Sequence, residues 1–333
     1  MKALFLAKHN FSFRDFRCNN GGTGIDNLIS ILRSISEVYT SPYLYEQCVE
    51  LGIMARKLEL THDRSRNPYV QDIDFMVSQA LNKGVDIFVA AGGDGTASYV
   101  ASSAIMHGHD RGLRPVLLGF PAGTANAGPI VHPLGTAEIS DLRRVGLDAI
   151  EVTDGDNVIG YGFNDVIIGN SFLATLDGKM VNLDARAMAE YDGHIVVRPG
   201  EKITGSDFSV RLDGKEAFIP HNVVQICVSA VNCDIPGSRA VLGGLLNAVG
   251  DAHSAAAAFI DRIMVDSDPA SWKWRGPIST THICFTQDNI LEISGFGEDA
   301  QIIVDGNPFI RRTDRLSFRI VPHACTALWG TGV

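Results

Sequence analysis

Short apolar runs alternate with amphipathic stretches over the first 146 residues of the chain. We predict buried strands at residues 3–7, 86–91 and 115–120 and helices at residues 24–39, 72–83 and 97–107. Strands that are joined by helical crossovers form a parallel sheet covered by helices, and ligands bind such a sheet at the carboxyl ends of its strands. The first half therefore predicts a Rossmann-like α/β domain spanning residues 1–146.

From residue 147 onward, short β-rich runs replace most of the helical spacing. We predict strands at residues 149–153, 158–168, 194–198, 208–212, 223–231, 282–285, 290–293, 301–304 and 315–321. Turn-forming dipeptides such as Asp154-Gly155 and Asp305-Gly306 separate several of them. One stretch differs, because the alanine-rich residues 251–265 predict a helix. The second half, residues 147–333, is therefore expected to form an antiparallel β-sandwich domain.

The charge and the apolar content of the 333-residue chain narrow the classes of function. A formal net charge of −10 disfavours the broad cationic surface that nucleic-acid binding needs, and it disfavours stable association with an anionic membrane. The apolar run at residues 3–7 is too short for a secretory signal or a membrane span. Six cysteines are scattered without a zinc-ligand pattern, so we expect reduced thiols in a cytoplasmic protein.

The predicted strand at residues 86–91 runs directly into Gly92-Gly93-Asp94-Gly95-Thr96, and a predicted helix follows. Without Cβ atoms, the glycines let backbone N–H groups approach an anion closely, and the N-terminus of the helix adds partial positive charge. Asp94 repels phosphate, so we interpret it as a magnesium ligand or as the base that takes a proton from an attacking hydroxyl. The alternative is a simple strand-to-helix turn in which Asp94 caps the helix.

A second loop of small residues follows the next predicted strand, with the sequence Pro121-Ala122-Gly123-Thr124-Ala125-Asn126-Ala127-Gly128-Pro129. A Gly-Gly-Asp-Gly-Thr motif followed about thirty residues later by a Gly-Thr-x-Asn loop resembles the nucleotide-binding core of the superfamily of NAD kinases and diacylglycerol-type lipid kinases. No Walker A sequence is present. The resemblance implies that Asp94 is needed for phosphoryl transfer. It also assigns a set of residues to the phosphates of ATP, namely Gly92, Gly93, Gly95, Thr96, Gly123, Thr124 and Asn126.

In the β-rich half, Asn164-Asp165 resembles the Asn-Glu/Asp pair with which NAD kinases hold their dinucleotide substrate. An amide beside a carboxylate suits ribose hydroxyls and adenine, which offer both donors and acceptors. The alternative is a strand that is interrupted by a bulge. Further along, Gly237 and Ser238 resemble part of the substrate-binding segment of NAD kinases, although the Thr-Ala-Tyr of that segment is missing here.

Other positions bear on which branch of the superfamily the chain resembles. Tyr99 stands where diacylglycerol and sphingosine kinases usually carry an acidic residue, and Asp305-Gly306-Asn307 replaces their Asp-Gly-Glu. The Gly-Thr-Ala-Asn loop, in contrast, is close to the Gly-Thr-Gly-Asn of the lipid kinases. It also resembles a divergent NAD-kinase-like group associated with acetoin catabolism. The acceptor is therefore open between NAD and a lipid hydroxyl.

The resemblance implies a cytoplasmic kinase that uses ATP and Mg²⁺ to phosphorylate a ribose hydroxyl of NAD, giving NADP. It further implies that the last strands return to the first domain and that the glycine motif and Asn164-Asp165 face one cleft. We also expect a homo-oligomer. The alternatives are a lipid kinase and a non-catalytic nucleotide-binding sensor of the same fold. His132 follows the second loop, where it could contact a phosphate or shuttle a proton; a lone histidine in a polar loop is more often only solvated, and we interpret it in that way.

Overall fold

The structure is a computed structural model that describes residues 1–8, 10–20, 23–61, 68–109, 112–123, 126, 128–176, 179–190, 198, 200–217, 222–231, 253–263, 267 and 279–330. The chain divides into two compact units. The first comprises Met1–Leu147 and His323–Val333, and the second comprises Asp148–Pro322. In the described part of the chain, no helix is long and apolar enough to cross a membrane.

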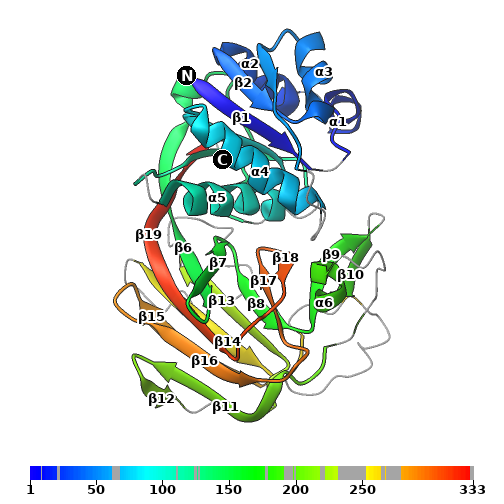
Figure 1. The fold of residues 1–333 in the computed structure, drawn as a ribbon. Helices are drawn as coiled ribbons and strands as arrows, with labels where there is room; N and C mark the ends of the chain where they lie inside the picture. Colours follow the sequence, from blue (N-terminus) through cyan, green and yellow to red (C-terminus); the bar gives the residue numbers. More distant parts are fainter. Residues whose placement is uncertain are drawn as a thin grey trace. The chain divides into compact units, whose positions relative to one another are not determined.

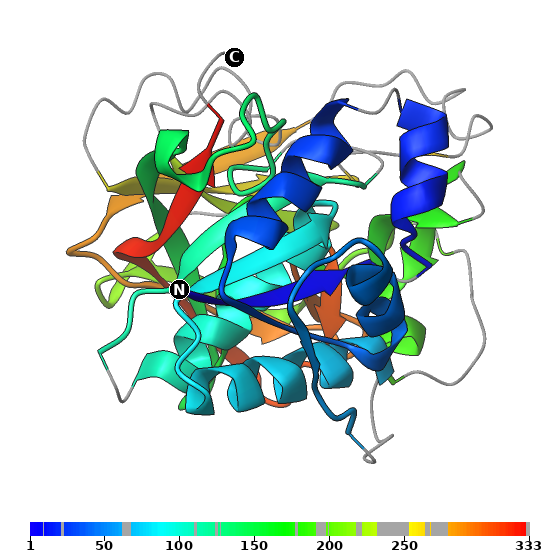
Figure 2. The same ribbon diagram turned by 90° about the horizontal axis from the view of Figure 1, so that it is seen from above.

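A parallel sheet covered by helices forms the first unit (Figure 1). Its strands lie in the order β5 (Val116–Pro121), β4 (Ile87–Gly92), β1 (Lys2–Ala7), β2 (Glu37–Thr40) and β3 (Ala55–Lys57). The helices are α1 (Phe13–Asn20), α2 (Thr23–Ser34), α3 (Pro42–Glu50), α4 (Pro68–Asn82) and α5 (Asp94–Gly108), with a short 3-10 turn at Ile139–Asp141. Figure 2 shows α2 on one face of the sheet and α4 and α5 on the other.

Side chains of the strands alternate between these two faces, as the pleat of a strand requires. Phe5 and Val89 pack into the apolar cluster that contains the buried face of α2, including Leu28. The end of a long strand, β19 (Arg315–Trp329), pairs in parallel with β5 through Thr326 and Ala327. The end of β19 therefore extends the sheet of the first unit.

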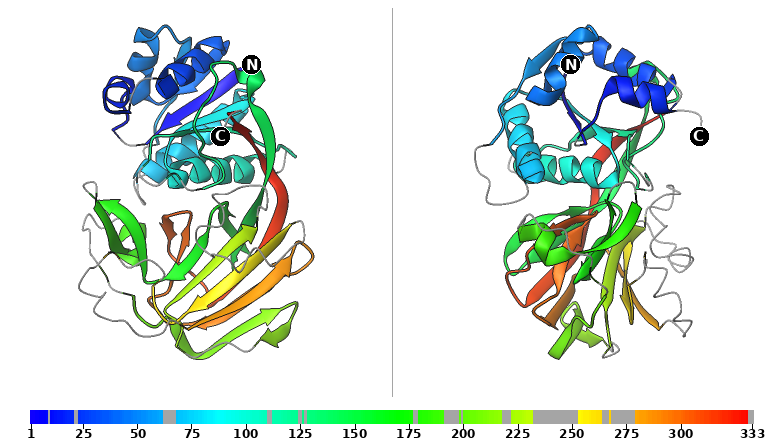
Figure 3. Two further views of the ribbon diagram at one scale, coloured as in Figure 1. Left: turned by 180° about the vertical axis from the view of Figure 1, so that it is seen from behind. Right: turned by 90° about the vertical axis from the view of Figure 1, so that its right-hand side faces the viewer.

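Two layers of antiparallel strands form the second unit, together with the small hairpin β9 (Ser171–Leu176) and β10 (Lys179–Asp184) and the helix α6 (Ala185–Glu190). One layer has the order β15 (Thr280–Thr286), β14 (Ser254–Ile260), β13 (Gln225–Val231), β8 (Val166–Gly169), β17 (Gln301–Val304) and β18 (Asn307–Phe309). The other contains β12 (Lys215–Ala217), β11 (Thr204–Leu212), β16 (Leu291–Phe296) and β19, with β6 (Arg143–Asp154) paired to β19 and β7 (Asn157–Gly162) paired to β6. Figure 3 shows these strands from two further sides.

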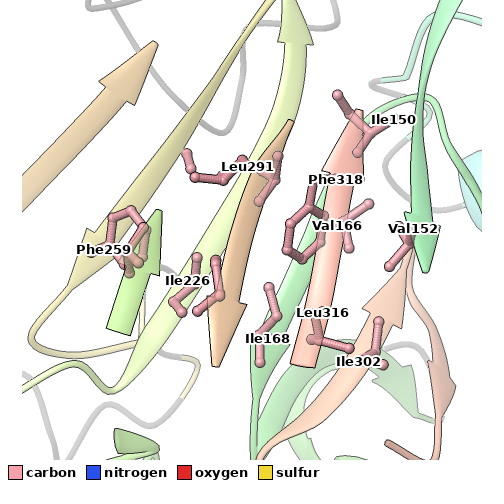
Figure 4. Close-up of a cluster of buried hydrophobic side chains, with 14 of the residues drawn as sticks. Ile150, Val152, Val166, Ile168, Ile226, Phe259, Leu291, Ile302, Leu316 and Phe318 are labelled. Atoms are coloured by element: carbon pink, nitrogen blue, oxygen red, sulfur yellow. The ribbon is translucent and has the colours of Figure 1, made fainter. Parts of the chain in front are cut away.

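One apolar core joins the two layers of the second unit. Ile226 and Phe259 come from the first layer, whereas Leu291 and Phe318 come from the second, and all four side chains are fully buried in one cluster (Figure 4). Side chains from facing sheets that interdigitate in this way are the defining feature of a β-sandwich. The predicted combination of an α/β fold with an antiparallel β fold is confirmed.

Two of the predicted helices are wrong in part or in whole. The helix predicted over residues 24–39 ends at Ser34, and Glu37–Thr40 forms β2, which pairs in parallel with β1. The helix predicted over residues 251–265 is instead β14, whose seven residues are all buried between β13 and β15. Alanine favours helix in isolation, but pairing on both edges and burial of both faces override that preference here. Of the strand predicted at residues 194–198, only Arg198 lies within the described residues.

Candidate functional site

The glycine motif lies where β4 ends and α5 begins. Gly92 is the last residue of β4, Gly93 is the N-cap of α5, and Asp94 is the first residue of the helix. The N-cap position therefore belongs to Gly93, which carries no side chain to accept from the first-turn amides, and the interpretation of Asp94 as a simple cap is not supported. N–H groups of the first turn of a helix lack acceptors within the helix, so they form an anion-binding end.

The second small-residue loop follows β5 and touches the glycine motif directly. The two strands are parallel neighbours, with Gly92 opposite Pro121, and the Ala122 amide donates to the Gly92 carbonyl at 3.0 Å. A Cβ atom on Gly123 would lie 2.2 Å from the Cα of Gly93. Two carbon atoms that are not bonded to each other never come this close. Only glycine at position 123 allows the two loops to approach this closely.

Asn126 holds this second loop in shape. Its backbone has a φ of +48°, a left-handed conformation that asparagine tolerates better than most residues. Its side-chain Oδ1 accepts from the Gly123 amide at 3.1 Å, and its Nδ2 donates to the Gly123 carbonyl at 3.1 Å. The amide group of Asn126 is thus bound to the peptide groups that flank Gly123, which fixes the loop against Gly93.

Asp94 packs against the returning part of the same loop. A Cβ atom on Gly128 would lie 2.6 Å from Oδ1 and 2.8 Å from Cγ of Asp94, so a side chain at position 128 would displace the carboxylate. The loop therefore leaves a glycine-sized space that the carboxylate fills. Gly95 follows Asp94 as the second residue of α5.

The surroundings of His132 differ from those expected from the sequence. Its side chain is half-buried, and the centroid of its ring lies 4.0 Å from the ring centroid of Trp329, which belongs to β19. Its Nε2 bonds the Pro129 carbonyl at 3.2 Å, so that nitrogen carries the proton. Burial lowers the pKa of His132, whereas the bond to Pro129 and the negative charge of Asp94 act in the opposite direction. His132 is therefore packed near Asp94 rather than solvated, a contact that sequence spacing does not reveal.

Thr96 is bound to Tyr69, which comes from the first turn of α4. A carbonyl oxygen only accepts, so the Tyr69 hydroxyl donates its single proton to the Ala7 carbonyl at 3.2 Å. In the contact of 3.3 Å between the Tyr69 hydroxyl and Thr96 Oγ1, the Thr96 hydroxyl is therefore the donor. Burial raises the pKa of Tyr69 to about 12, so the hydroxyl keeps its proton. Tyr69 links the glycine motif to the carboxyl end of β1, and sequence reasoning missed it.

A cavity of about 410 Å³ opens at the carboxyl ends of β1 and β2. Apolar side chains such as Phe11 and Met76 form part of its lining, and Lys8 and Asp72 add charged groups. Tyr69 lines it as well, so the cavity adjoins the residue that binds Thr96. Pockets of this size with a few polar groups in an apolar wall are typical small-molecule sites, and parallel sheets bind ligands at this edge.

The second unit contains the Asn164-Asp165 pair, in the turn between β7 and β8. Asn164 Nδ2 donates to Asp165 Oδ2 at 2.9 Å, and Ser229 Oγ donates to the Asn164 carbonyl at 2.5 Å. Asn164 Oδ1 is buried and has no hydrogen-bond partner among the described residues. The pair thus presents a buried acceptor next to a carboxylate. Its expected position in one cleft with Asp94 stays a prediction.

Some of the predicted site residues lie outside the described residues, namely Thr124, Gly237 and Ser238. Within the described residues, no group of three or more His, Cys, Asp and Glu side chains is arranged to hold a metal ion. A magnesium ion is usually held by one or two carboxylates, several waters and the phosphates of a substrate. The single carboxylate of Asp94, beside an anion-binding helix end, fits that requirement.

Comparisons with known proteins agree with this geometry. Residues 49–152, which include both small-residue loops, match the family described as "Diacylglycerol kinase catalytic domain". An uncharacterized protein of Archaeoglobus fulgidus is 26% identical over 298 residues, covering 87% of this chain and 89% of its own. A probable lipid kinase, YegS-like, of Xanthomonas campestris is 40% identical over 90 residues, which are 23% of this chain and 29% of that protein.

Among solved structures, yeast NADH kinase in complex with NADH shares the fold with a TM-score of 0.52 and 10% identity, covering 100% of this chain and 83% of that chain. This likeness supports the two-domain α/β and β architecture described above. Residues 49–152 are therefore similar to the diacylglycerol kinase catalytic domain, and the chain as a whole has a fold like that of yeast NADH kinase.

Proposed function

We propose that the protein transfers the terminal phosphoryl group of Mg-ATP to a ribose hydroxyl of NAD, which yields NADP and ADP. The observation that carries the proposal is the close contact between the two small-residue loops, in which a Cβ on Gly123 would lie 2.2 Å from the Cα of Gly93. Such contact brings two stretches of bare backbone and the N-terminus of α5 to one place. A phosphate chain is the ligand that best fits this combination.

The cavity at the carboxyl ends of β1 and β2 supports a nucleotide as the source of that phosphate chain. Its volume of about 410 Å³ suits a base and its ribose, and its lining combines Phe11 and Met76 with Lys8 and Asp72. Tyr69 lines the cavity and also bonds Thr96 of the glycine motif. A nucleotide with its base in the cavity would therefore direct its phosphates toward Thr96.

Asp94 is proposed to act as the base. A bond forms between the acceptor oxygen and the γ-phosphorus, the bond from that phosphorus to the bridging oxygen breaks, and the hydroxyl proton passes to the Asp94 carboxylate. The first-turn amides of α5 stabilise the negative charge that develops on the phosphoryl oxygens. Asp94 would also hold the magnesium ion, which when bound neutralises charge on the phosphates.

The acceptor side of the proposal rests on Asn164 and Asp165. The buried Oδ1 of Asn164 has no partner in the described part of the chain, and a buried acceptor without a donor costs about 1–3 kcal/mol. A hydroxyl or an N–H group of an incoming molecule supplies that donor. The ribose hydroxyls and the adenine amine of NAD carry such groups, which supports NAD as the acceptor.

A lipid hydroxyl is the second candidate acceptor. It is favoured by the match of residues 49–152 to the diacylglycerol kinase catalytic domain and by the similarity to the YegS-like probable lipid kinase of Xanthomonas campestris over 90 residues. The family match covers residues 49–152, which contain both small-residue loops. The family match ends at Val152, so it does not extend to Asn164 and Asp165.

A substrate panel separates the two candidates. Purified protein is incubated with Mg-ATP and with NAD, NADH, diacylglycerol or sphingosine, and both ADP release and phosphorylated product are measured. We expect NADP from NAD, and no phosphorylated lipid. Phosphorylated lipid without NADP would replace this proposal by the lipid-kinase alternative, and ADP release without any acceptor dependence would contradict both.

A further inference from the structure

Asp305 lies in the tight turn between β17 and β18, with a φ of +47°, and Gly306 follows with a φ of +79°. Two successive positive φ angles are what a two-residue hairpin turn of type I′ requires, and Asp-Gly is a preferred sequence for it. The turn accounts for the backbone conformation of Asp305. It does not account for the burial of this residue, which is 5% exposed, so its carboxylate does not face solvent.

The carboxylate of Asp305 accepts hydrogen bonds from three successive backbone amides. Phe163 N donates to Oδ2 at 2.7 Å, and the amides of Asn164 and Asp165 both donate to Oδ1 at 2.8 Å. In return, the Asp305 amide donates to the Asp165 carbonyl at 2.9 Å. Bonds from an amide to an ionised acceptor are among the stronger hydrogen bonds in proteins. One side chain thus fixes the orientation of three consecutive peptide groups about 140 residues away in sequence.

Two of these three residues, Asn164 and Asp165, carry the side chains that the proposed function assigns to the acceptor. With its backbone fixed, Asn164 donates Nδ2 to Asp165 and leaves Oδ1 buried without a partner among the described residues. Binding groups work only when their own positions are held, because a displacement of about 1 Å can cost a hundredfold in rate. Asp305 already accepts from three backbone amides, so it is suited to hold the pair rather than to bind the acceptor itself.

We propose that Asp305 is a positioning residue, which orients Asn164 and Asp165 for the acceptor through the backbone of residues 163–165. The inference rests on the proposed function for the identity of the acceptor, but not for the role of Asp305 in holding the turn. Asparagine also tolerates the left-handed conformation, so Asp305→Asn keeps the hairpin turn. It removes the charge and replaces one acceptor oxygen by an NH₂ group, which cannot accept from the Phe163 amide.

Asp154 offers a matched control in the same unit. It is 4% exposed, and its carboxylate accepts from the amides of Arg312 and Thr313 at 2.5 and 2.8 Å. Asp154 therefore fixes the backbone of residues 312–313 in the way that Asp305 fixes residues 163–165. Residues 312–313 do not include the acceptor pair. Asp154→Asn should lower the melting temperature to a similar extent and leave acceptor binding unchanged, which separates positioning from general stability.

The test combines kinetics with hydrogen exchange on the full chain. For Asp305→Asn we expect the KM for NAD to rise about ten- to a hundredfold, with the KM for Mg-ATP unchanged. Amide exchange in the peptide that contains residues 163–165 should become faster, whereas Asp154→Asn should change neither that exchange nor the KM for NAD. Unchanged exchange at residues 163–165 in Asp305→Asn would overturn the inference, as would equal KM values for the two variants.

Failure of the proposed function gives a different pattern. If the wild-type protein forms no NADP, the choice of acceptor is wrong, and the exchange measurement still decides whether Asp305 holds the turn. Faster exchange in Asp305→Asn alone then supports the positioning role for the turn, and unchanged exchange removes it. NADP formation therefore tests the choice of acceptor, and amide exchange at residues 163–165 tests the role of Asp305.

Discussion

Gly128→Ala tests the position of Asp94 without changing Asp94 itself. The added Cβ would lie 2.6 Å from Oδ1 and 2.8 Å from Cγ of Asp94, whereas ordinary contacts begin near 3.4 Å. The carboxylate must therefore shift by about 1 Å, a displacement that can lower a rate by about a hundredfold. Because the end of an Asp side chain moves easily, the free energy of unfolding should change by less than about 1 kcal/mol.

The assay for Gly128→Ala pairs kcat for ADP release, with Mg-ATP and NAD both saturating, with the melting temperature of the same preparation. Gly24→Ala is the matched control, because its new Cβ would meet only Phe120, at an ordinary 3.7 Å, and it should leave kcat unchanged. A Gly128→Ala variant with wild-type kcat would show that the position of the Asp94 carboxylate does not matter for transfer. A large fall in melting temperature would show instead that the added methyl disturbs the fold.

Three further predictions follow from the contacts described above. Gly123→Ala should destabilise the protein by about 1–3 kcal/mol and weaken nucleotide binding, since its Cβ meets the backbone of Gly93 rather than a movable side chain; denaturant unfolding and a nucleotide Kd check this. Burial lowers the pKa of His132 below 6.5, so the unfolded chain binds a proton at higher pH than the folded one. The free energy of unfolding should therefore decrease as the pH falls below about 6.5, and the decrease should be shallower in His132→Gln, as measured by urea unfolding from pH 7 to pH 5. Ala257→Leu should lower the free energy of unfolding by about 1–3 kcal/mol through overpacking, because Ala257 is fully buried in β14, between β13 and β15, whereas a helical surface position would accept leucine without loss. Thermal unfolding distinguishes the two.

The sequence predicted three of the five strands of the parallel sheet because their signals are local, but it missed β2 and β3. β1, β4 and β5 are short apolar runs, and α2 and α4 show the spacing of amphipathic helices. The same local reasoning failed for Ser254–Ile260, where four consecutive alanines suggested a helix. That segment is a strand because its two neighbours, β13 and β15, pair along its full length, and this pairing depends on residues far away in sequence.

The site shows the same division between local and distant information. Gly92–Gly93–Asp94 was identified from sequence because a strand, a glycine turn and a helix are consecutive in the chain. The contacts that hold this motif are not consecutive: Tyr69 is 27 residues from Thr96. The contact that positions the acceptor pair is not local either, because Asp305 and Asp165 are 140 residues apart in the sequence. No pattern in a single sequence marks such partners.

NADP formation by the wild-type protein and by Asp94→Asn is the measurement that tests the central claim most directly. The wild type should convert NAD and Mg-ATP to NADP and ADP in equal amounts. Asp94→Asn should lose about 10²–10⁴-fold in kcat, because an amide cannot accept the hydroxyl proton, while its nucleotide Kd and melting temperature stay close to those of the wild type. Retention of more than about a tenth of the wild-type kcat by Asp94→Asn would contradict Asp94 as the base, and the absence of NADP from the wild-type reaction would contradict NAD as the acceptor.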